Sequence, residues 1–308
     1  MQSTKIEREK PALLGAGLAP LGASCLWGGM YVVSKASFHV IPPLTLGLLR
    51  LLVGGLVLWL ALWFSAHAGR GRTQSRPAFT AREKRRLPLL GLTITVTLIT
   101  QFSGTDLATA HEGALLTTIT PIFIVPIAWL MLRERPGWRV LVGMLVALLG
   151  VVLIVGIAES GGSGKSGTAW LGDILLVISA LAWALFTVLG APLVRTSSAL
   201  VVATYGTLWG AVFLVPFAVW ELLWHPLGVL SWESLGSVLY LGVGATALAW
   251  FLWYRGVERL PASVAAVFFF AQPLVGGLLS ALLLHEVLGL SFWIGGLVLA
   301  VGILLVSV

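Results

Sequence analysis

Arg50 is the charged residue whose position most needs a physical account, because it lies well inside a run of apolar residues from about 44 to 66. A cation in such a run is costly unless it faces water, a polar cavity or a bound anion. Its guanidinium could hold a carboxylate through two parallel hydrogen bonds. The alternatives are that Arg50 reaches back to the end of its helix or binds main-chain carbonyl groups of a neighbouring helix.

Tryptophans and a few polar side chains accompany this arginine in the apolar runs. Trp27 and Trp183 lie well within their runs, so they could line a cavity and stack on a flat apolar solute, with simple packing as the equal alternative. We predict a substrate-binding site that contains Arg50, Trp27, Tyr31, Trp183, Gln272 and Thr120.

Other ionisable groups lie at or near the ends of apolar runs. Asp106, His111 and Asp173 are candidates for proton coupling, although ordinary solvated turns would also contain such residues. Glu134 and Glu286 each lie in a short turn between two runs. We expect them to cap a helix or to form a salt bridge with a nearby arginine, with gating as the second possibility.

Covalent catalysis and cofactor binding have no support in the sequence. The tripeptide Gly164-Lys165-Ser166 lacks the first glycine of a phosphate-binding loop. Cys25 is the single cysteine, so neither an intramolecular disulfide nor a cysteine-based metal site can form. We therefore predict no catalytic residues, no metal and no cofactor, and we expect that the protein is not an enzyme.

The elements that must position these residues are membrane helices. The chain of 308 residues is 58% hydrophobic and only 10% charged, with a mean hydropathy of +1.00, which is too apolar for a soluble core of this length. A spanning helix needs about 20 mostly apolar residues. Ten runs meet this criterion, at residues 12–34, 44–66, 87–106, 113–132, 138–157, 169–191, 198–221, 234–254, 261–284 and 290–307.

The basic residues indicate the orientation of these runs. The net charge of +7 does not indicate a nucleic-acid partner, because lysines and arginines lie between the apolar runs and form no stripe on a soluble domain. When the N-terminus is placed in the cytoplasm, sixteen of the 19 lysines and arginines fall on the cytoplasmic side. We therefore predict that both termini are cytoplasmic.

An internal repeat divides the chain into two halves. Residues of the same type recur at an offset of 152 residues. Pro121, Glu134, Gly143 and Gly150 of the first half correspond, in this order, to Pro273, Glu286, Gly295 and Gly302 of the second half. Each copy holds five runs, and an odd number inserts the second copy upside down. We predict an all-α integral membrane protein with ten transmembrane helices in two inverted five-helix repeats, residues 1–158 and 168–308, joined by a Gly/Ser linker at 159–167.

Three further features belong to this plan. Pro121 and Pro273 interrupt corresponding runs, where they can act as hinges. Gly143 and Gly150, like their counterparts, recur at helical spacing and allow close helix approach in lipid. Glu134 and Glu286 fall at opposite membrane faces, so they cannot share one chemical step.

The pattern resembles the drug/metabolite transporter superfamily, in its ten-helix, two-repeat bacterial exporter branch. The residues that carry the resemblance are Pro43, Arg50, the tripeptide Leu26-Trp27-Gly28 and the two Pro…Glu…Gly…Gly segments. The resemblance implies that spans 1–4 and 6–9 surround a central cavity and that spans 5 and 10 stand outside it. The second copy departs from the first, because Ala182-Trp183-Ala184 lacks the glycine and Gly206 stands where Arg50 would repeat.

These observations predict a secondary transporter in the bacterial inner membrane that works by alternating access. The resemblance favours export of small metabolites, Arg50 suits a carboxylate, and the tryptophans suit a ring, so we expect amino acids, aromatic ones first. Multidrug or other metabolite efflux is the alternative, and a membrane-embedded lipid-modifying transferase is an alternative of another class. The expected partners are a small-molecule substrate and the lipid bilayer, with protons as a candidate coupling ion, and the duplicated chain is compatible with a monomer.

Overall fold

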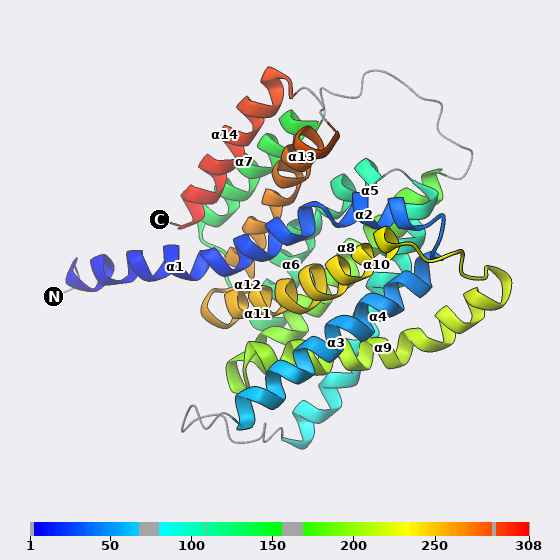
Figure 1. Ribbon diagram of the computed structural model, residues 1–308. Helices are drawn as coiled ribbons and strands as arrows, with labels where there is room; N and C mark the ends of the chain where they lie inside the picture. Colours follow the sequence, from blue (N-terminus) through cyan, green and yellow to red (C-terminus); the bar gives the residue numbers. More distant parts are fainter. Residues whose placement is uncertain (1–2, 68–79, 109, 156–168, 285–287, 308) are drawn as a thin grey trace.

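The computed structural model describes residues 3–67, 80–108, 110–155, 169–284 and 288–307, and in these residues every regular element is a helix (Figure 1). A helix satisfies its main-chain hydrogen bonds internally, which an apolar chain in lipid requires. The predicted all-α class is therefore confirmed. The predicted Gly/Ser linker and Glu286 lie outside the described residues.

The first half of the chain, up to residue 155, contributes seven helices within the described residues. Its first apolar run is divided at Gly29, and its fourth is divided at residues 118–119. The helices are α1 (Ser3–Gly28), α2 (Met30–Ser37), α3 (Pro43–His67), α4 (Ala81–Leu107), α5 (Ala110–Thr117), α6 (Thr120–Leu132) and α7 (Trp138–Val155).

The second half, from residue 169, follows the same order with different interruptions. Its third long helix contains a π-helical segment, η1, and its fourth contains a 3₁₀ segment, η2. The elements are α8 (Ala169–Thr196), α9 (Ala199–Trp224), α10 (Trp232–Leu239), η1 (Tyr240–Leu248), α11 (Ala249–Arg259), α12 (Ala262–Val267), η2 (Phe268–Phe270), α13 (Ala271–Leu284) and α14 (Leu290–Ser307).

Seven stretches of the described helices are long and apolar enough to cross a membrane, and three shorter apolar helices accompany them, namely Thr120–Leu132, Trp138–Ile154 and Leu290–Val306. Together they coincide in position with the ten predicted runs. That all ten cross the bilayer stays a prediction. The outer surface carries many exposed large apolar side chains, such as Leu130 at 79% and Trp232 at 89% exposure, which suits contact with lipid.

The two predicted hinge prolines stand directly after helix interruptions. Pro121 lies in the first turn of α6, just after the break between α5 and α6, where its missing N–H group costs no helical hydrogen bond. Pro273 lies in the first turn of α13, just after the 3₁₀ segment. Corresponding helices of the two halves are thus interrupted at corresponding places, while the hinge role of both prolines stays a prediction.

Helices α7 and α14 form the most extensive helix pair, and glycines make it possible. A Cβ atom added at Gly143 would lie 2.7 Å from the carbonyl oxygen of Gly302, which is closer than real Cβ atoms come. Gly150 and Gly295 are equally close to each other. The predicted close approach at these four glycines is therefore confirmed.

Several contacts between helices of the two halves occur in corresponding pairs. Helix α4 packs on α8 as α11 packs on α1, and α6 packs on α8 as α13 packs on α1. Helix α4 contacts α9, and η1 contacts α3 in the corresponding way. This contact pattern is the one that a two-fold relation between the halves produces.

Charged side chains cap two helix ends near one end of the bundle. The carboxylate of Glu221 on α9 accepts hydrogen bonds from the main-chain N–H groups of Leu44 and Thr45 at 3.0 and 2.7 Å, at the start of α3. The Nζ atom of Lys35 on α2 donates to three carbonyl oxygens at the end of α4, including that of Asp106 at 2.6 Å. Each charge has the sign that the helix dipole favours.

Candidate functional site

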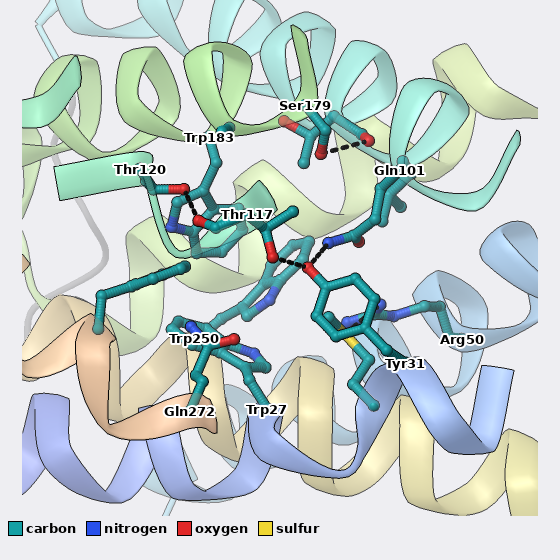
Figure 2. Close-up of a pocket in the computed structure, with 15 residues that line it drawn as sticks. Trp27, Tyr31, Arg50, Gln101, Thr117, Thr120, Ser179, Trp183, Trp250 and Gln272 are labelled. Carbon is teal, nitrogen blue, oxygen red and sulfur yellow. Dashed lines mark hydrogen bonds between the residues drawn. The ribbon is translucent and has the colours of Figure 1, made fainter. Parts of the chain in front are cut away.

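A small cavity lies between the two halves of the chain (Figure 2). Its lining residues come from α1 to α6 and from α8, α11, η2 and α13. The space open to the centre of a water molecule is about 20 Å³, which is room for roughly one water. All six residues of the predicted substrate site line this cavity. Because it is too small for an organic solute here, binding would require the cavity to widen.

Aromatic rings form much of the wall. The ring centroids of Trp27 and Trp183 lie 5.1 Å apart in an edge-to-face arrangement, and Trp250 lies 5.6 Å from Trp183. Phe269 completes this group at 5.4 Å from Trp27. Packing and cavity lining are therefore not exclusive for Trp27 and Trp183, because these indoles pack against one another and also line the cavity.

Arg50 is buried at the edge of the cavity with 1% exposure. Its Nε atom donates to Thr246 Oγ1 at 2.8 Å, and its Nη2 atom donates to the carbonyl oxygen of Ala245 at 3.1 Å. Its Nη1 atom lies 3.1 Å from the sulfur of Met30. Arg50 thus binds a carbonyl group of a neighbouring segment, as one of the alternatives predicted, and does not reach the end of its helix.

The charge of Arg50 has no counter-ion in the part of the chain that the structure describes. No carboxylate among these residues forms an ion pair with it. The rings of Phe102 and Trp250 lie 5.7 and 6.0 Å from the guanidinium carbon, and such contacts compensate a buried cation only in part. The site is therefore electrostatically suited to an anionic group of a bound solute.

The π-helical segment η1 supplies the acceptors for Arg50. Its wider turn lets Thr246 Oγ1 donate to the carbonyl oxygen of Leu241, five residues earlier, at 2.8 Å. The carbonyl oxygen of Ala245 accepts from both Arg50 and the indole Nε1 of Trp27, the latter at 2.9 Å. Local π-helical turns are frequent at functional sites.

A hydrogen-bonded chain of polar side chains forms another wall, beside Arg50. Gln101 Nε2 donates to the hydroxyl oxygen of Tyr31 at 2.7 Å, and that hydroxyl donates to Thr117 Oγ1 at 2.6 Å. Gln101, Thr246 and Met30 were not predicted as site residues. Gln101 could have been found as an amide inside an otherwise apolar run, whereas the carbonyl of Ala245 leaves no trace in the sequence.

Thr120, Trp183 and Gln272 form the rest of the predicted site (Figure 2). The hydroxyl of Thr120 donates to the carbonyl oxygen of Thr117. By contrast, Trp183 Nε1 and Gln272 Nε2 are buried and have no acceptor among the described residues. These two N–H groups are available to a bound solute.

The candidates for proton coupling lie away from this cavity. Asp106 is exposed and lines a second, larger cavity of about 540 Å³ at the ends of α4 and α9, together with Glu221 and His225. Asp173 is half-buried near the start of α8 and does not line the central cavity. His111 belongs to α5, and its side chain lies outside the description. A coupling role for the three residues stays a prediction.

Glu134 joins three helix ends. Its carboxylate forms an ion pair with Arg195 at the end of α8, at 3.2 Å. It also accepts hydrogen bonds from the main-chain N–H and the hydroxyl of Ser263, at the start of α12. Both predicted structural roles, the salt bridge and the helix cap, are therefore confirmed, and the partners come from the second half of the chain.

A helical bundle with a lipid-compatible surface and an internal, partly polar cavity is the architecture of a multi-pass membrane protein and is compatible with transport. The particular family follows from the sequence comparison. The profile of the EamA-like transporter family matches residues 13–156 and again residues 170–308. The chain belongs to this family, within the drug/metabolite transporter superfamily.

Curated relatives agree with this assignment. The chain is 30% identical to the "Uncharacterized transporter YetK" of Bacillus subtilis (strain 168), over 94% of this chain and 87% of the relative. It is 24% identical to an "Uncharacterized transporter" of Archaeoglobus fulgidus, over 92% of this chain and 93% of that protein. A solved crystal structure with 23% identity covers 94% of this chain and 95% of its own, with a TM-score of 0.74.

These findings establish the class of protein. It is a transporter and not an enzyme, so the expectation of no enzymatic activity is confirmed and the lipid-modifying transferase is excluded. Its apolar helices and bacterial relatives make it a multi-pass protein of the inner membrane. A small-molecule substrate and a lipid bilayer are its partners.

Proposed function

We propose that this protein is a secondary transporter that exports amino acids, aromatic ones preferentially, by alternating access. The observation that carries the proposal is Arg50, a buried cation without a counter-ion among the described residues, at the edge of a cavity lined by Trp27, Trp183 and Trp250. A carboxylate would supply the missing negative charge, and the indoles would contact the ring.

Alternating access follows from the proposed topology. The chain consists of two inverted five-helix repeats, residues 1–158 and 168–308, with ten spans and both termini in the cytoplasm. The recurring contacts of corresponding helices and the two family matches support this arrangement. Movement at the breaks before Pro121 and Pro273 would open the cavity first to one side and then to the other.

Glu134 is the proposed gate on the cytoplasmic side. It connects α6 of the first repeat to α8 and α12 of the second, so release of Arg195 and Ser263 would let the repeats separate there. Glu286 is its counterpart by repeat and retains the same proposed role on the outer side. Protons are the proposed coupling ion, with Asp106, His111 and Asp173 as the candidate groups.

Counterflow in proteoliposomes tests the proposal. The purified protein is reconstituted with a high internal concentration of one amino acid, and uptake of labelled tyrosine, phenylalanine, leucine and a cationic drug is compared. We expect saturable uptake of the aromatic amino acids. Uptake of the cationic drug alone would instead establish the alternative, a multidrug efflux carrier, although Arg50 would repel such a compound. Repetition with an imposed pH gradient tests proton coupling.

A further inference from the structure

Two nitrogen donors of cavity-lining residues lack an acceptor among the described residues. They are the indole Nε1 of Trp183 and the side-chain amide Nε2 of Gln272. Trp183 is 8% exposed and Gln272 is 2% exposed, so bulk water does not solvate them. A buried donor without an acceptor costs free energy and is rare in native proteins, and both of these donors belong to residues that line the same cavity.

The corresponding residues of the first half show that this arrangement is not imposed by the fold. Trp27, at an offset of 156 residues from Trp183, donates its Nε1 hydrogen to the carbonyl oxygen of Ala245 at 2.9 Å. Thr120, at an offset of 152 from Gln272, donates its hydroxyl hydrogen to Thr117. The first-half donors thus have acceptors within the protein, whereas their second-half counterparts have none among the described residues.

We infer that Trp183, Gln272 and Thr120 form a second polar subsite of the substrate cavity, which binds a hydroxyl group at the far end of the substrate from its carboxylate. The inference rests on the proposed function and specifies its substrate class. In Figure 2 these three residues lie on the opposite side of the view from Arg50.

A hydroxyl group matches the hydrogen-bonding capacity of this subsite. Its oxygen can accept two hydrogen bonds, one from Trp183 Nε1 and one from Gln272 Nε2, and both nitrogens lack an acceptor among the described residues. Its hydrogen needs one acceptor, and the hydroxyl oxygen of Thr120 retains its lone pairs because its own hydrogen is donated to Thr117. The inferred substrate is therefore an amino acid with a phenolic or similar hydroxyl, and tyrosine should be preferred over phenylalanine.

The first experiment compares counterflow of tyrosine and phenylalanine. A site that binds a hydroxyl discriminates strongly against an analogue that lacks it, so we expect a tyrosine preference of at least about tenfold for the wild-type protein. In Trp183→Phe and Gln272→Met the ratio of tyrosine transport to phenylalanine transport should fall toward one, because only tyrosine loses a hydrogen bond. Trp27→Phe is the matched control, because its lost N–H group was satisfied by Ala245, and it should affect both substrates alike.

Equal transport of both amino acids by the wild-type protein would overturn the inference and leave the proposed function standing. So would a tyrosine preference that survives both Trp183→Phe and Gln272→Met. Absence of transport for every amino acid would instead contradict the proposed function, and the subsite then has to be tested by binding alone.

The binding experiment follows the indole N–H resonance of Trp183 by ¹⁵N nuclear magnetic resonance, assigned through its loss in Trp183→Phe. Addition of p-cresol, which carries the hydroxyl but no carboxylate, should shift this resonance, and toluene should not. A resonance that responds to neither compound, or equally to both, would overturn the subsite. This measurement needs neither transport nor amino-acid binding.

Discussion

Tyr31 in the first half and Thr187 in the second half occupy corresponding positions, at an offset of 156 residues. Each hydroxyl accepts one hydrogen bond, from Gln101 at 2.7 Å and from Trp253 at 3.1 Å respectively, and these two donors also correspond, at an offset of 152. The duplication has therefore preserved a hydrogen bond while both partners changed. Only the first-half pair lines the cavity.

Arg50 and Gly206 show the opposite outcome at another corresponding pair. Where the first half carries a guanidinium, the second half carries no side chain, and a Cβ atom at Gly206 would lie 3.3 Å from the ring of Phe186. The first half thus places a charge beside the cavity, and the second half fills the corresponding space with an aromatic ring. The two halves share a scaffold but divide the chemistry between them.

The π-helical segment extends this division. Residues 240–248 form η1, whereas the corresponding residues 88–96 belong to the continuous α-helix α4. The buried carbonyl of Ala245 accepts hydrogen bonds from Arg50 and Trp27, both of the first half. The π-helical segment of the second half therefore provides the hydrogen-bond acceptor for the guanidinium and the indole of the first half.

Removal of Arg50 should have the largest effect on transport. A charge-assisted hydrogen bond contributes about 1.5–3 kcal/mol, so Arg50→Met should weaken the apparent affinity for carboxylate substrates by roughly 10- to 150-fold in counterflow. The melting temperature should not fall, because the carbonyl of Ala245 retains Trp27 as a donor and a buried cation is removed. Gly206→Ala is the matched control and should change affinity less than threefold or so. Unchanged affinity in folded Arg50→Met would remove Arg50 from the site.

Overpacking of the α7–α14 pair should have the next largest effect, on stability. Gly302→Val places a side chain against main-chain atoms of Ala147 and Gly143 and should destabilise the protein by about 1–3 kcal/mol or more. Gly236→Ala on α10 is the control, because nothing lies within 4 Å of the added Cβ atom, and it should be neutral or slightly stabilising. Thermal unfolding in detergent measures both. Equal melting temperatures would show that α7 and α14 tolerate separation.

The hydroxyl of Thr187 should contribute mainly to stability, and the corresponding hydroxyl of Tyr31 mainly to substrate affinity. Thr187→Val leaves the buried Trp253 Nε1 without its acceptor and should cost about 1–3 kcal/mol of stability with little change in substrate affinity. Tyr31→Phe disrupts the hydrogen-bonded chain at the cavity and should lower affinity by roughly fivefold with a smaller stability loss. Counterflow and thermal unfolding of both variants test this. The same affinity change in both would erase the distinction between the halves.

The ion pair between Glu134 and Arg195 should have the smallest effect on stability. Arg195 is half exposed, so the coupling energy in a double-mutant cycle with Glu134→Gln and Arg195→Gln should be about 0.2–1 kcal/mol. The transport rate should change more than the affinity if the pair acts as a gate. An unaltered rate in all three variants would reduce Glu134 to a helix cap for α12.

Much of the site was predictable from residue types. Arg50 attracted attention because a cation deep in an apolar run is costly, and Trp27 and Trp183 because indoles at such depth suit a cavity wall; all three line one cavity. The helices were predictable as well, because lipid forces each apolar run to satisfy its main-chain groups internally. The breaks at Gly29 and at residues 118–119 were not predicted, although the prolines indicated disturbance near the second.

The amino-acid sequence by itself determined the solvent of this protein, its helical class, its duplication and the small residues that bring α7 and α14 together. Tertiary structure alone decided that Arg50 has carbonyl and hydroxyl partners but no carboxylate within the described ranges, and that Trp27 is satisfied there while Trp183 is not. The physical reason is that the acceptor shared by Arg50 and Trp27, the carbonyl of Ala245, is a main-chain group far away in the chain, 218 residues from Trp27. A carbonyl group is common to every residue, so its availability depends on helix geometry and packing.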